Sequence, residues 1–169
     1  MLIHIGVAAH SSSSNPEIAG RFVNSLPENT RILLGGYWGI MRDVADAARR
    51  RGLQTVFFLP LNPPVQVPAD EIFVPIDTGL DPKGRSLILV RSSDVLAVLG
   101  GEVGTMIEAL AAYSYGKPVV ILRGTGRSTD KLEESFKSWF DARELAPVLY
   151  VNTPEDLARE AVRLASRSP

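Results

Sequence analysis

The chain has 169 residues, of which 45% are hydrophobic and 22% are charged. This composition excludes an intrinsically disordered protein and fits one globular domain, which we expect to span residues 1–169. Cysteine is absent, which excludes disulfides, iron–sulfur clusters and thiol nucleophiles. The net charge of −1 gives no sign of a nucleic-acid or anionic-membrane surface, so neither is an expected partner.

The N-terminus and the two histidines indicate where the protein is located and whether it binds a metal. The segment Met1-Leu2-Ile3-His4-Ile5 has no basic region and no cleavage site, and no apolar run reaches the roughly 20 residues of a membrane span. We therefore expect a cytoplasmic protein with no membrane partner. The two histidines, His4 and His10, cannot build a metal site alone, so no metal is predicted, and only a carboxylate-bound magnesium stays open.

Short apolar runs alternate with segments of helical spacing along the chain. Strands are predicted at 2–9, 31–34, 54–59, 95–99, 119–122 and 148–151, with a short extra element at 72–75. Helices are predicted at 16–26, 39–51, 80–92, 105–115, 129–143 and 154–166. Because the strands are continuous apolar runs, they predict a mainly parallel sheet with helices on both faces, an α/β fold of three layers.

One long irregular segment interrupts this alternation. Residues 60–68 (PLNPPVQVP) contain four prolines in nine positions, which excludes a helix or central strand. A loop of this kind is a functional lid, a subunit contact or a plain connection, and the sequence leaves the three open.

Three loops that follow predicted strands are rich in small residues, and ligands bind at that end of parallel strands. The first, residues 8–14, contains Ser11. The second carries Gly35, Gly36 and Gly39, and the third carries Gly100, Gly101, Gly104 and Thr105. The last two lead directly into helices, where unpaired N–H groups favour a phosphate. Neither is a P-loop or a dinucleotide fingerprint, and a tight turn alone explains either one.

Glu108 lies four residues after Gly104 and therefore close to the same opening. Its carboxylate can stabilise the helix N-terminus, or it can act as a general base or stabilise positive charge on a sugar. Tyr37 and Trp38 in the second loop can stack on a flat ring or pack between subunits. His10 either contacts the ligand or is an ordinary loop residue.

The segment 93–108 resembles the P-G-G-x-G-T-x-x-E motif of the Lonely Guy (LOG) phosphoribohydrolases, which were long labelled lysine decarboxylases. Gly101, Gly104, Thr105 and Glu108 match, whereas Gly100 replaces the proline and Glu102 replaces the second glycine.

Two further segments agree with this resemblance, which covers roughly residues 2–122. Residues 35–41, ending in Met41, resemble the family's G-G-x-x-G-L-M segment, and Arg85 matches the arginine of its E-R-K element. The short, cysteine-free form resembles more closely a sister branch that contains the molybdenum-cofactor carrier protein.

The resemblance implies a Rossmann-like domain, a homo-oligomer (dimer or tetramer) and an AMP-like nucleotide as ligand. Gly101, Gly104 and Thr105 would hold its phosphate, together with the other glycine loop. Arg85 would contact phosphate or ribose. Glu108 would stabilise the ribosyl cation or activate water, releasing a free base and ribose 5-phosphate. No resident cofactor is required.

The alternative is a non-enzymatic carrier of a molybdopterin-type cofactor, or a nucleotide sensor. Arg85 and Glu108 favour the enzyme, whereas Glu102 favours the carrier or sensor, because a carboxylate in an anion loop repels phosphate unless it turns away. A pyridoxal-phosphate decarboxylase is set aside, since none of the four lysines lies in a setting that suggests a Schiff base.

Overall fold

The computed structural model describes residues 1–166 and contains one seven-stranded sheet, ordered β4-β3-β2-β1-β5-β6-β7. All neighbouring strands pair in parallel. The strands are β1 (Ile3–Ala8), β2 (Thr30–Leu34), β3 (Thr55–Leu59), β4 (Phe73–Asp77), β5 (Val95–Val98), β6 (Val119–Leu122) and β7 (Val148–Val151). The chain runs outward from β1 to β4 and returns to β5 on the other side of β1. The strand order therefore reverses between β1 and β5, where parallel sheets bind ligands.

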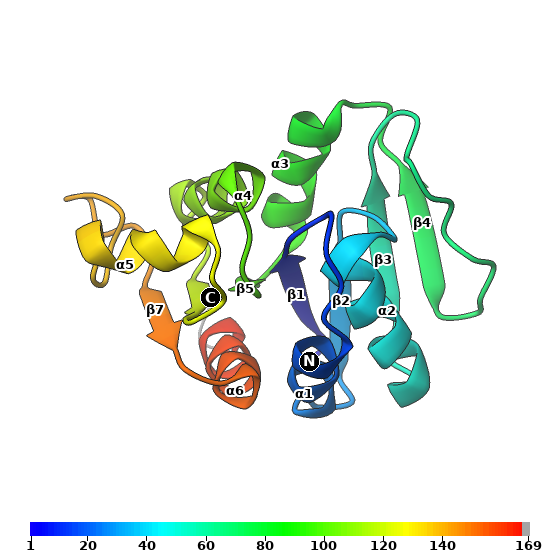
Figure 1. The fold of residues 1–169 in the computed structure, drawn as a ribbon, viewed down its shortest axis with the longest axis horizontal. Coiled ribbons are helices and arrows are strands. Elements are labelled where there is room, and N and C mark those ends of the chain that lie inside the picture. The colour runs from blue at the N-terminus through cyan, green and yellow to red at the C-terminus, as the bar shows by residue number, and fades with distance from the viewer. Residues whose placement is uncertain (167–169) are drawn as a thin grey trace.

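Helices cover both faces of the sheet (Figure 1). One face packs against α1 (Pro16–Asn24), α2 (Gly39–Arg51) and α6 (Pro154–Ala165). The other packs against α3 (Pro82–Ser92), α4 (Val103–Ser114) and α5 (Leu132–Ser135), which follows a 3-10 turn at Ser128–Lys131. Two apolar cores result, one on each side of the sheet. The expected three-layer α/β fold is confirmed.

Side-chain caps explain why three helices start where the sequence predicts. Asn15 accepts a hydrogen bond from the backbone N–H of Ile18, and Asp81 and Thr153 do the same for the residues three positions ahead of them. In each case proline follows the cap, where its missing N–H costs nothing. Gly52 ends α2 in the left-handed conformation, with φ of 68°.

The helix predicted at 129–143 is wrong. Only the 3-10 turn and the four-residue α5 are helical there, and the chain is irregular from Phe136 onward. Tertiary contacts take the backbone groups that a helix would use. The carbonyl of Ser138 accepts from Val148 N–H at the start of β7, and the carbonyl of Asp141 accepts from the Tyr113 hydroxyl at 3.3 Å.

Two boundaries differ slightly from prediction. α4 begins at Val103, two residues early, because the glycine loop itself enters the helix. The short element at 72–75 becomes β4, the parallel edge strand. In residues 1–166 no helix is both long and apolar enough to cross a membrane.

Gly39 shows how one glycine holds two loops together. Its φ is +57°, and a Cβ there would lie 2.5 Å from the carbonyl oxygen of His10. The same carbonyl accepts a hydrogen bond from Ile40 N–H at 3.1 Å. A Cβ on Gly20, in the middle of α1, would instead meet no atom within 4 Å, on an ordinary helical backbone.

We expect Gly39→Ala to lower the free energy of unfolding by about 2 kcal/mol, because the left-handed backbone and the contact with His10 both penalise a methyl group. Gly20→Ala should instead raise it by about 0.5–1 kcal/mol. Urea unfolding of both variants measures this. Equal effects of the two substitutions would contradict the strained position of Gly39.

Candidate functional site

The loops at the carboxyl end of the sheet are tied to one another through the backbone. His10 N–H donates to the carbonyl of Gly100 at 2.9 Å, and Ile40 N–H donates to the carbonyl of His10 at 3.1 Å. The three small-residue loops predicted from the sequence are therefore joined at one place. That place is the switch point between β1 and β5.

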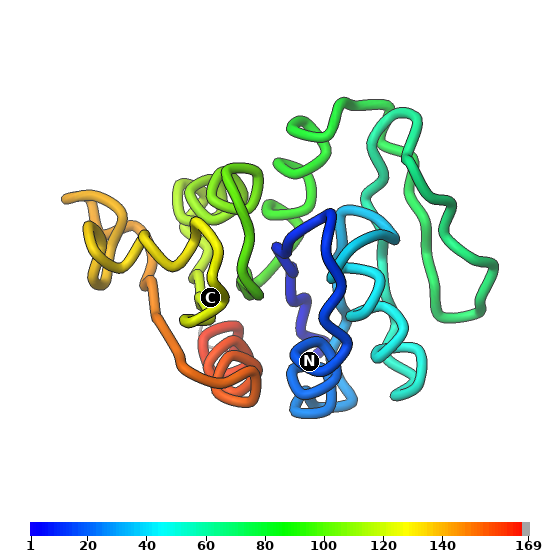
Figure 2. Tube along the Cα trace, viewed as in Figure 1, coloured from blue at the N-terminus to red at the C-terminus, as the bar shows by residue number. Residues whose placement is uncertain are grey.

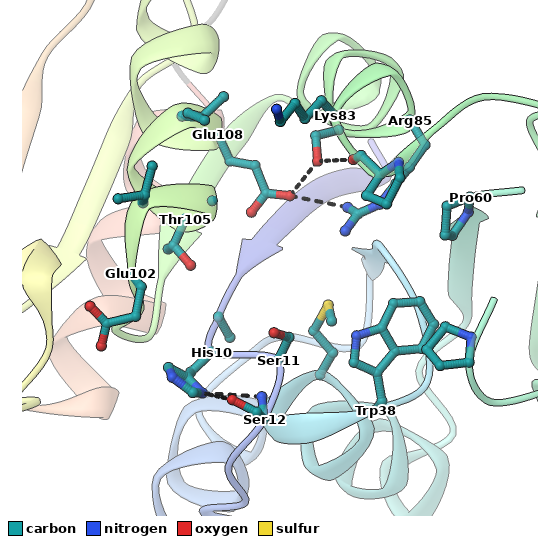
Figure 3. A pocket seen from close by; sticks show the side chains of 18 of the residues that line it. His10, Ser11, Ser12, Trp38, Pro60, Lys83, Arg85, Glu102, Thr105 and Glu108 are labelled. Atoms are coloured by element: carbon teal, nitrogen blue, oxygen red, sulfur yellow. Dashed lines mark hydrogen bonds and ion pairs between the residues drawn. The ribbon is translucent and has the colours of Figure 1, made fainter. Parts of the chain in front are cut away.

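A cavity of about 610 Å³ opens beside these loops (Figure 3). Six predicted site residues line it: Ser11, Met41, Arg85, Gly104, Thr105 and Glu108. His10, Trp38, Lys83 and Glu102 also line it. Its size lies within the range of small-molecule sites.

Arg85 and Glu108 form a buried ion pair in the cavity wall. The guanidinium of Arg85, on α3, donates to Glu108 Oε1, on α4, at 3.0 Å. The Ser86 hydroxyl donates to the same oxygen at 2.7 Å. Arg85 is 8% exposed and Glu108 is 7% exposed. Burial raises the pKa of Glu108, and the nearby charge of Arg85 and the Ser86 hydroxyl only partly oppose it.

The pair leaves two polar atoms without protein partners. Both hydrogen bonds to Glu108 go to Oε1, so Oε2 accepts none from residues 1–166, and Figure 3 shows the carboxylate on the cavity side of α4. Arg85 Nε is buried and also unpaired within that range. Buried polar atoms are normally satisfied, so unpaired ones in a cavity wall indicate a place for a ligand.

Three glycines make room for side chains of the site. A Cβ on Gly35 would lie 1.8 Å from Arg85 Nη1, and one on Gly36 would lie 2.1 Å from the Trp38 ring. A Cβ on Gly101 would lie 2.0 Å from Thr105 Oγ1. The structure places these glycines, together with Gly39 and Gly100, next to the lining residues and outside the lining itself.

The N-terminus of α4 lies at the cavity without a side-chain cap. The N–H groups of Val103, Gly104 and Thr105 find no acceptor within residues 1–166. Lys83, on the facing helix α3, also lines the cavity, and Figure 3 shows it nearer to Glu108 than to Thr105. Unpaired N–H groups at the positive end of a helix dipole favour an anion at the start of α4.

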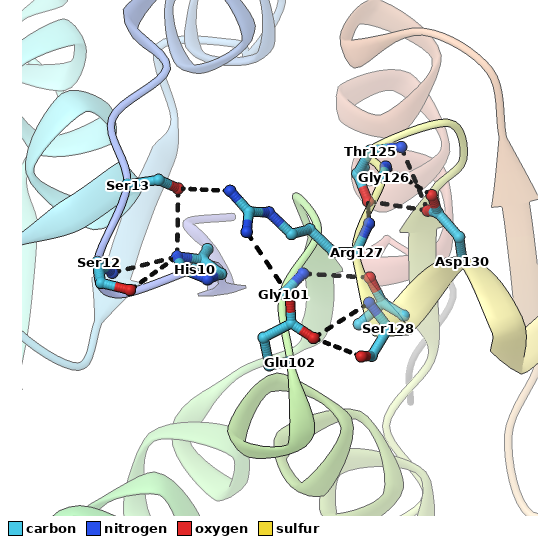
Figure 4. A network of polar contacts seen from close by, with 11 residues as sticks. His10, Ser12, Ser13, Gly101, Glu102, Thr125, Gly126, Arg127, Ser128 and Asp130 are labelled. Atoms are coloured by element: carbon cyan, nitrogen blue, oxygen red, sulfur yellow. Dashed lines mark hydrogen bonds and ion pairs between the residues drawn. The ribbon is translucent and has the colours of Figure 1, made fainter.

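Glu102 is turned into a separate polar network (Figure 4). Its carboxylate accepts from the backbone N–H of Ser128 at 3.3 Å and from the Ser128 hydroxyl, and it lies 3.7 Å from Arg127. The pKa of Glu102 is lowered, mainly by the hydrogen bond from the Ser128 hydroxyl. Its charge is thus matched by neighbours in the loop after β6, although the side chain still borders the cavity.

Arg127 is a residue of this network that the sequence motifs did not predict. It connects Glu102 to the serine loop, because Arg127 Nη2 donates to Ser13 Oγ at 3.3 Å. The signal was present in Gly124-Thr125-Gly126-Arg127, a small-residue loop that directly follows a strand, like the other three. Lys83 and Ser86 were not predicted either, since only the packing of α3 against α4 brings them to the cavity.

The proline-rich segment contributes to the cavity rim. Pro60, Leu61, Asn62 and Pro64 line it opposite the α4 N-terminus. Trp38, whose role the sequence left open, lines the same cavity over Gly36. These residues place apolar surface on one side of the site and the charged pair on the other (Figure 3).

The raised pKa of Glu108 makes stability depend on pH. The folded chain holds this proton more tightly than the unfolded chain, so the free energy of unfolding falls as pH rises above the ordinary glutamate value of 4.5. Glu108→Gln removes the titration. The stability of the wild type relative to this variant should therefore fall in urea unfolding as the pH rises above 4.5. A constant difference, or the same trend in the exposed control Glu28→Gln, would contradict the buried pair.

Comparison with known proteins places this geometry in a family. An uncharacterized protein of Archaeoglobus fulgidus is 32% identical over 125 residues, which cover 72% of this chain and 81% of that protein. The X-ray structure of TM1055 is 29% identical, with a TM-score of 0.84 over 96% of this chain and 99% of that one.

The molybdenum cofactor carrier protein of Chlamydomonas reinhardtii is 22% identical, with a TM-score of 0.73 over 99% of this chain and 100% of that one. It shares the fold. The resemblance to the LOG superfamily is thus confirmed. The model of the SLOG cluster4 family matches residues 3–158, and the chain belongs to that family.

Proposed function

We propose that the cavity binds a phosphate ester that carries a flat ring, such as a nucleoside 5′-monophosphate or a molybdopterin-type cofactor. One observation carries this proposal: the uncapped N-terminus of α4 opens into the cavity whose wall holds the unsatisfied Arg85–Glu108 pair. The family and the named activity of the carrier protein support it.

The phosphate fits at the α4 end of the cavity. The N–H groups of Val103, Gly104 and Thr105 supply donors at the positive end of the helix dipole. Glu102 does not oppose this, because its carboxylate accepts from Ser128 and its charge is matched by Arg127. The electrostatic repulsion between Glu102 and a phosphate, which the sequence suggested, is therefore reduced.

The ring fits at the other end. Trp38 offers an indole face, and Met41 and Pro60 offer further apolar surface. Arg85 and Glu108 then lie between phosphate and ring, where a ribose or an equivalent linker would sit. This arrangement accommodates both ligand types without a metal or any resident cofactor.

We also propose a homo-oligomer, a dimer or tetramer. Its support is a set of exposed apolar side chains on α3 and α4, formed by Leu87, Ile88 and Leu110. Exposed apolar patches of this kind mark protein contacts more often than isolated exposed residues do.

The phosphate position is tested by removing one N–H donor without changing a side-chain charge. Val103 is the first residue of α4 and is 65% exposed, and the backbone before it is already extended, so proline fits there. We expect Val103→Pro to weaken AMP binding roughly tenfold in calorimetric titration, because a charge-assisted hydrogen bond is lost. Adenosine affinity should not change.

Val103→Ala is the matched control, since it trims the same side chain and keeps the N–H. The proposal fails if Val103→Pro and Val103→Ala bind AMP alike, or if AMP and molybdopterin-type ligands show no saturable binding to the wild type.

A second candidate function is hydrolysis of the N-glycosidic bond of the bound nucleotide. The free Oε2 of Glu108 in the cavity wall favours it, because a carboxylate beside the sugar can activate water or stabilise a ribosyl cation. In this reaction the bond between the base and ribose C1′ breaks. Water adds its hydroxyl to C1′ and a proton goes to the departing base.

Release of ribose 5-phosphate from AMP and N6-substituted AMP measures this activity. If Glu108 takes part, Glu108→Gln should lower the rate at least about 100-fold, whereas Glu102→Gln should leave most of it, since Glu102 faces Ser128. Binding without any release would instead assign the cavity to a carrier or sensor.

A further inference from the structure

A second cavity, of about 390 Å³, lies on the same sheet face as α3 but toward the amino ends of the strands. We call it the sheet-face groove. Its lining consists of His4, Arg31, Leu33, Gln54, Val56, Phe58, Val74, Ile76 and Ser92. None of these residues lines the cavity at the carboxyl ends. The two cavities are therefore separate.

The groove opens on the sheet face that receives few helices. The connections from β1 to β4 all run in one direction, so α1, α2 and the irregular β3–β4 connection, residues 60–72, share the opposite face, where Val67 and Ile72 pack against that core. Figure 2 follows the β3–β4 connection as a bare path beside β4. The return crossover from β4 to β5 supplies one helix, α3, which covers the outer strands of the groove face only in part.

The floor of the groove is a continuous apolar surface across three strands. Leu33 on β2 pairs with Val56 on β3, which pairs with Val74 on β4. Phe58 and Ile76 form the next pair along β3 and β4. Ile76 is 41% exposed, so apolar surface remains open to solvent at the far end of this row.

The opposite end of the groove is cationic and unsatisfied. Arg31 pairs with His4 across β1 and β2, and its Nη1 lies 3.3 Å from His4 Nε2. Arginine only donates, so His4 Nε2 accepts in this contact, and His4 Nδ1 lies 4.0 Å from Asp94 Oδ2. Arg31 has no carboxylate within 4.0 Å in residues 1–166, and its buried Nε has no acceptor there.

We propose that the sheet-face groove binds an amphipathic carboxylate, a small molecule with one anionic group and one unbranched apolar chain. The carboxylate supplies the charge and the acceptors that Arg31 lacks, and the chain covers the row from Leu33 to Ile76. Two strand spacings separate β2 from β4, which sets a chain of roughly 10 Å. This site is independent of the phosphate site.

Octanoate is a suitable probe. Acetate, which lacks the apolar chain, and octanol, which lacks the charge, are the comparison ligands. We expect octanoate to shift the backbone amide signals of Arg31, Val56 and Val74 in a saturable NMR titration, and those of Gly104 and Thr105 not to move. Acetate and octanol should bind at least about tenfold more weakly, because each satisfies only one end of the groove.

Two substitutions test the two ends. Arg31→Gln should weaken octanoate binding roughly tenfold or more, and Ile76→Asn should weaken it severalfold at an exposed position that the fold tolerates. Arg50→Gln, on the exposed surface of α2, is the matched control and should leave the affinity unchanged.

If octanol shifts the same amide signals as strongly as octanoate does, the assignment of a carboxylate is wrong. It is also wrong if both Arg31→Gln and Ile76→Asn leave the octanoate affinity intact. Sedimentation identifies the other occupant. If Ile76→Asn dissociates an oligomer and octanoate does not bind, a second copy of the chain covers the groove and the proposal is wrong.

Discussion

The site depends on one buried charge pair, Arg85 with Glu108. Desolvating two charges costs several kcal/mol, and a buried ion pair returns little net stability even with good geometry. The fold nevertheless accommodates it. Gly35 clears the space for the guanidinium, Ser86 supports the carboxylate, and α3 and α4 meet across the pair. An apolar pair of similar volume would stabilise the α3–α4 contact at least as well, so the charges are better explained by a ligand than by stability.

Much of this architecture could be predicted from the sequence, because its causes are local. Continuous apolar strands predicted a parallel sheet, and Asn15, Asp81 and Thr153 followed by proline predicted three helix starts. The cavity position followed from a general property of parallel sheets, and Arg85, Thr105 and Glu108 do line one cavity.

The remaining features depend on long-range contacts that no local pattern encodes. The segment 129–143 has helical spacing, yet Val148 and Tyr113 take its polar groups. Glu102 was expected to oppose a phosphate by charge repulsion. Its partners Arg127 and Ser128 lie about 25 residues away in sequence and meet it only in the fold, so the sequence could not show that its charge is matched. Gly35 and Gly36 of the second loop were expected to hold phosphate, whereas the structure places them against Arg85 and Trp38.

We propose above all that a phosphate ester binds at the open N-terminus of α4, with its sugar or linker against the Arg85–Glu108 pair. A crystal structure of the protein with bound AMP is the decisive measurement. We expect phosphate oxygens within hydrogen-bond distance of the N–H groups of Gly104 and Thr105, and the ribose beside Glu108. A phosphate bound elsewhere, or AMP outside this cavity, would contradict it.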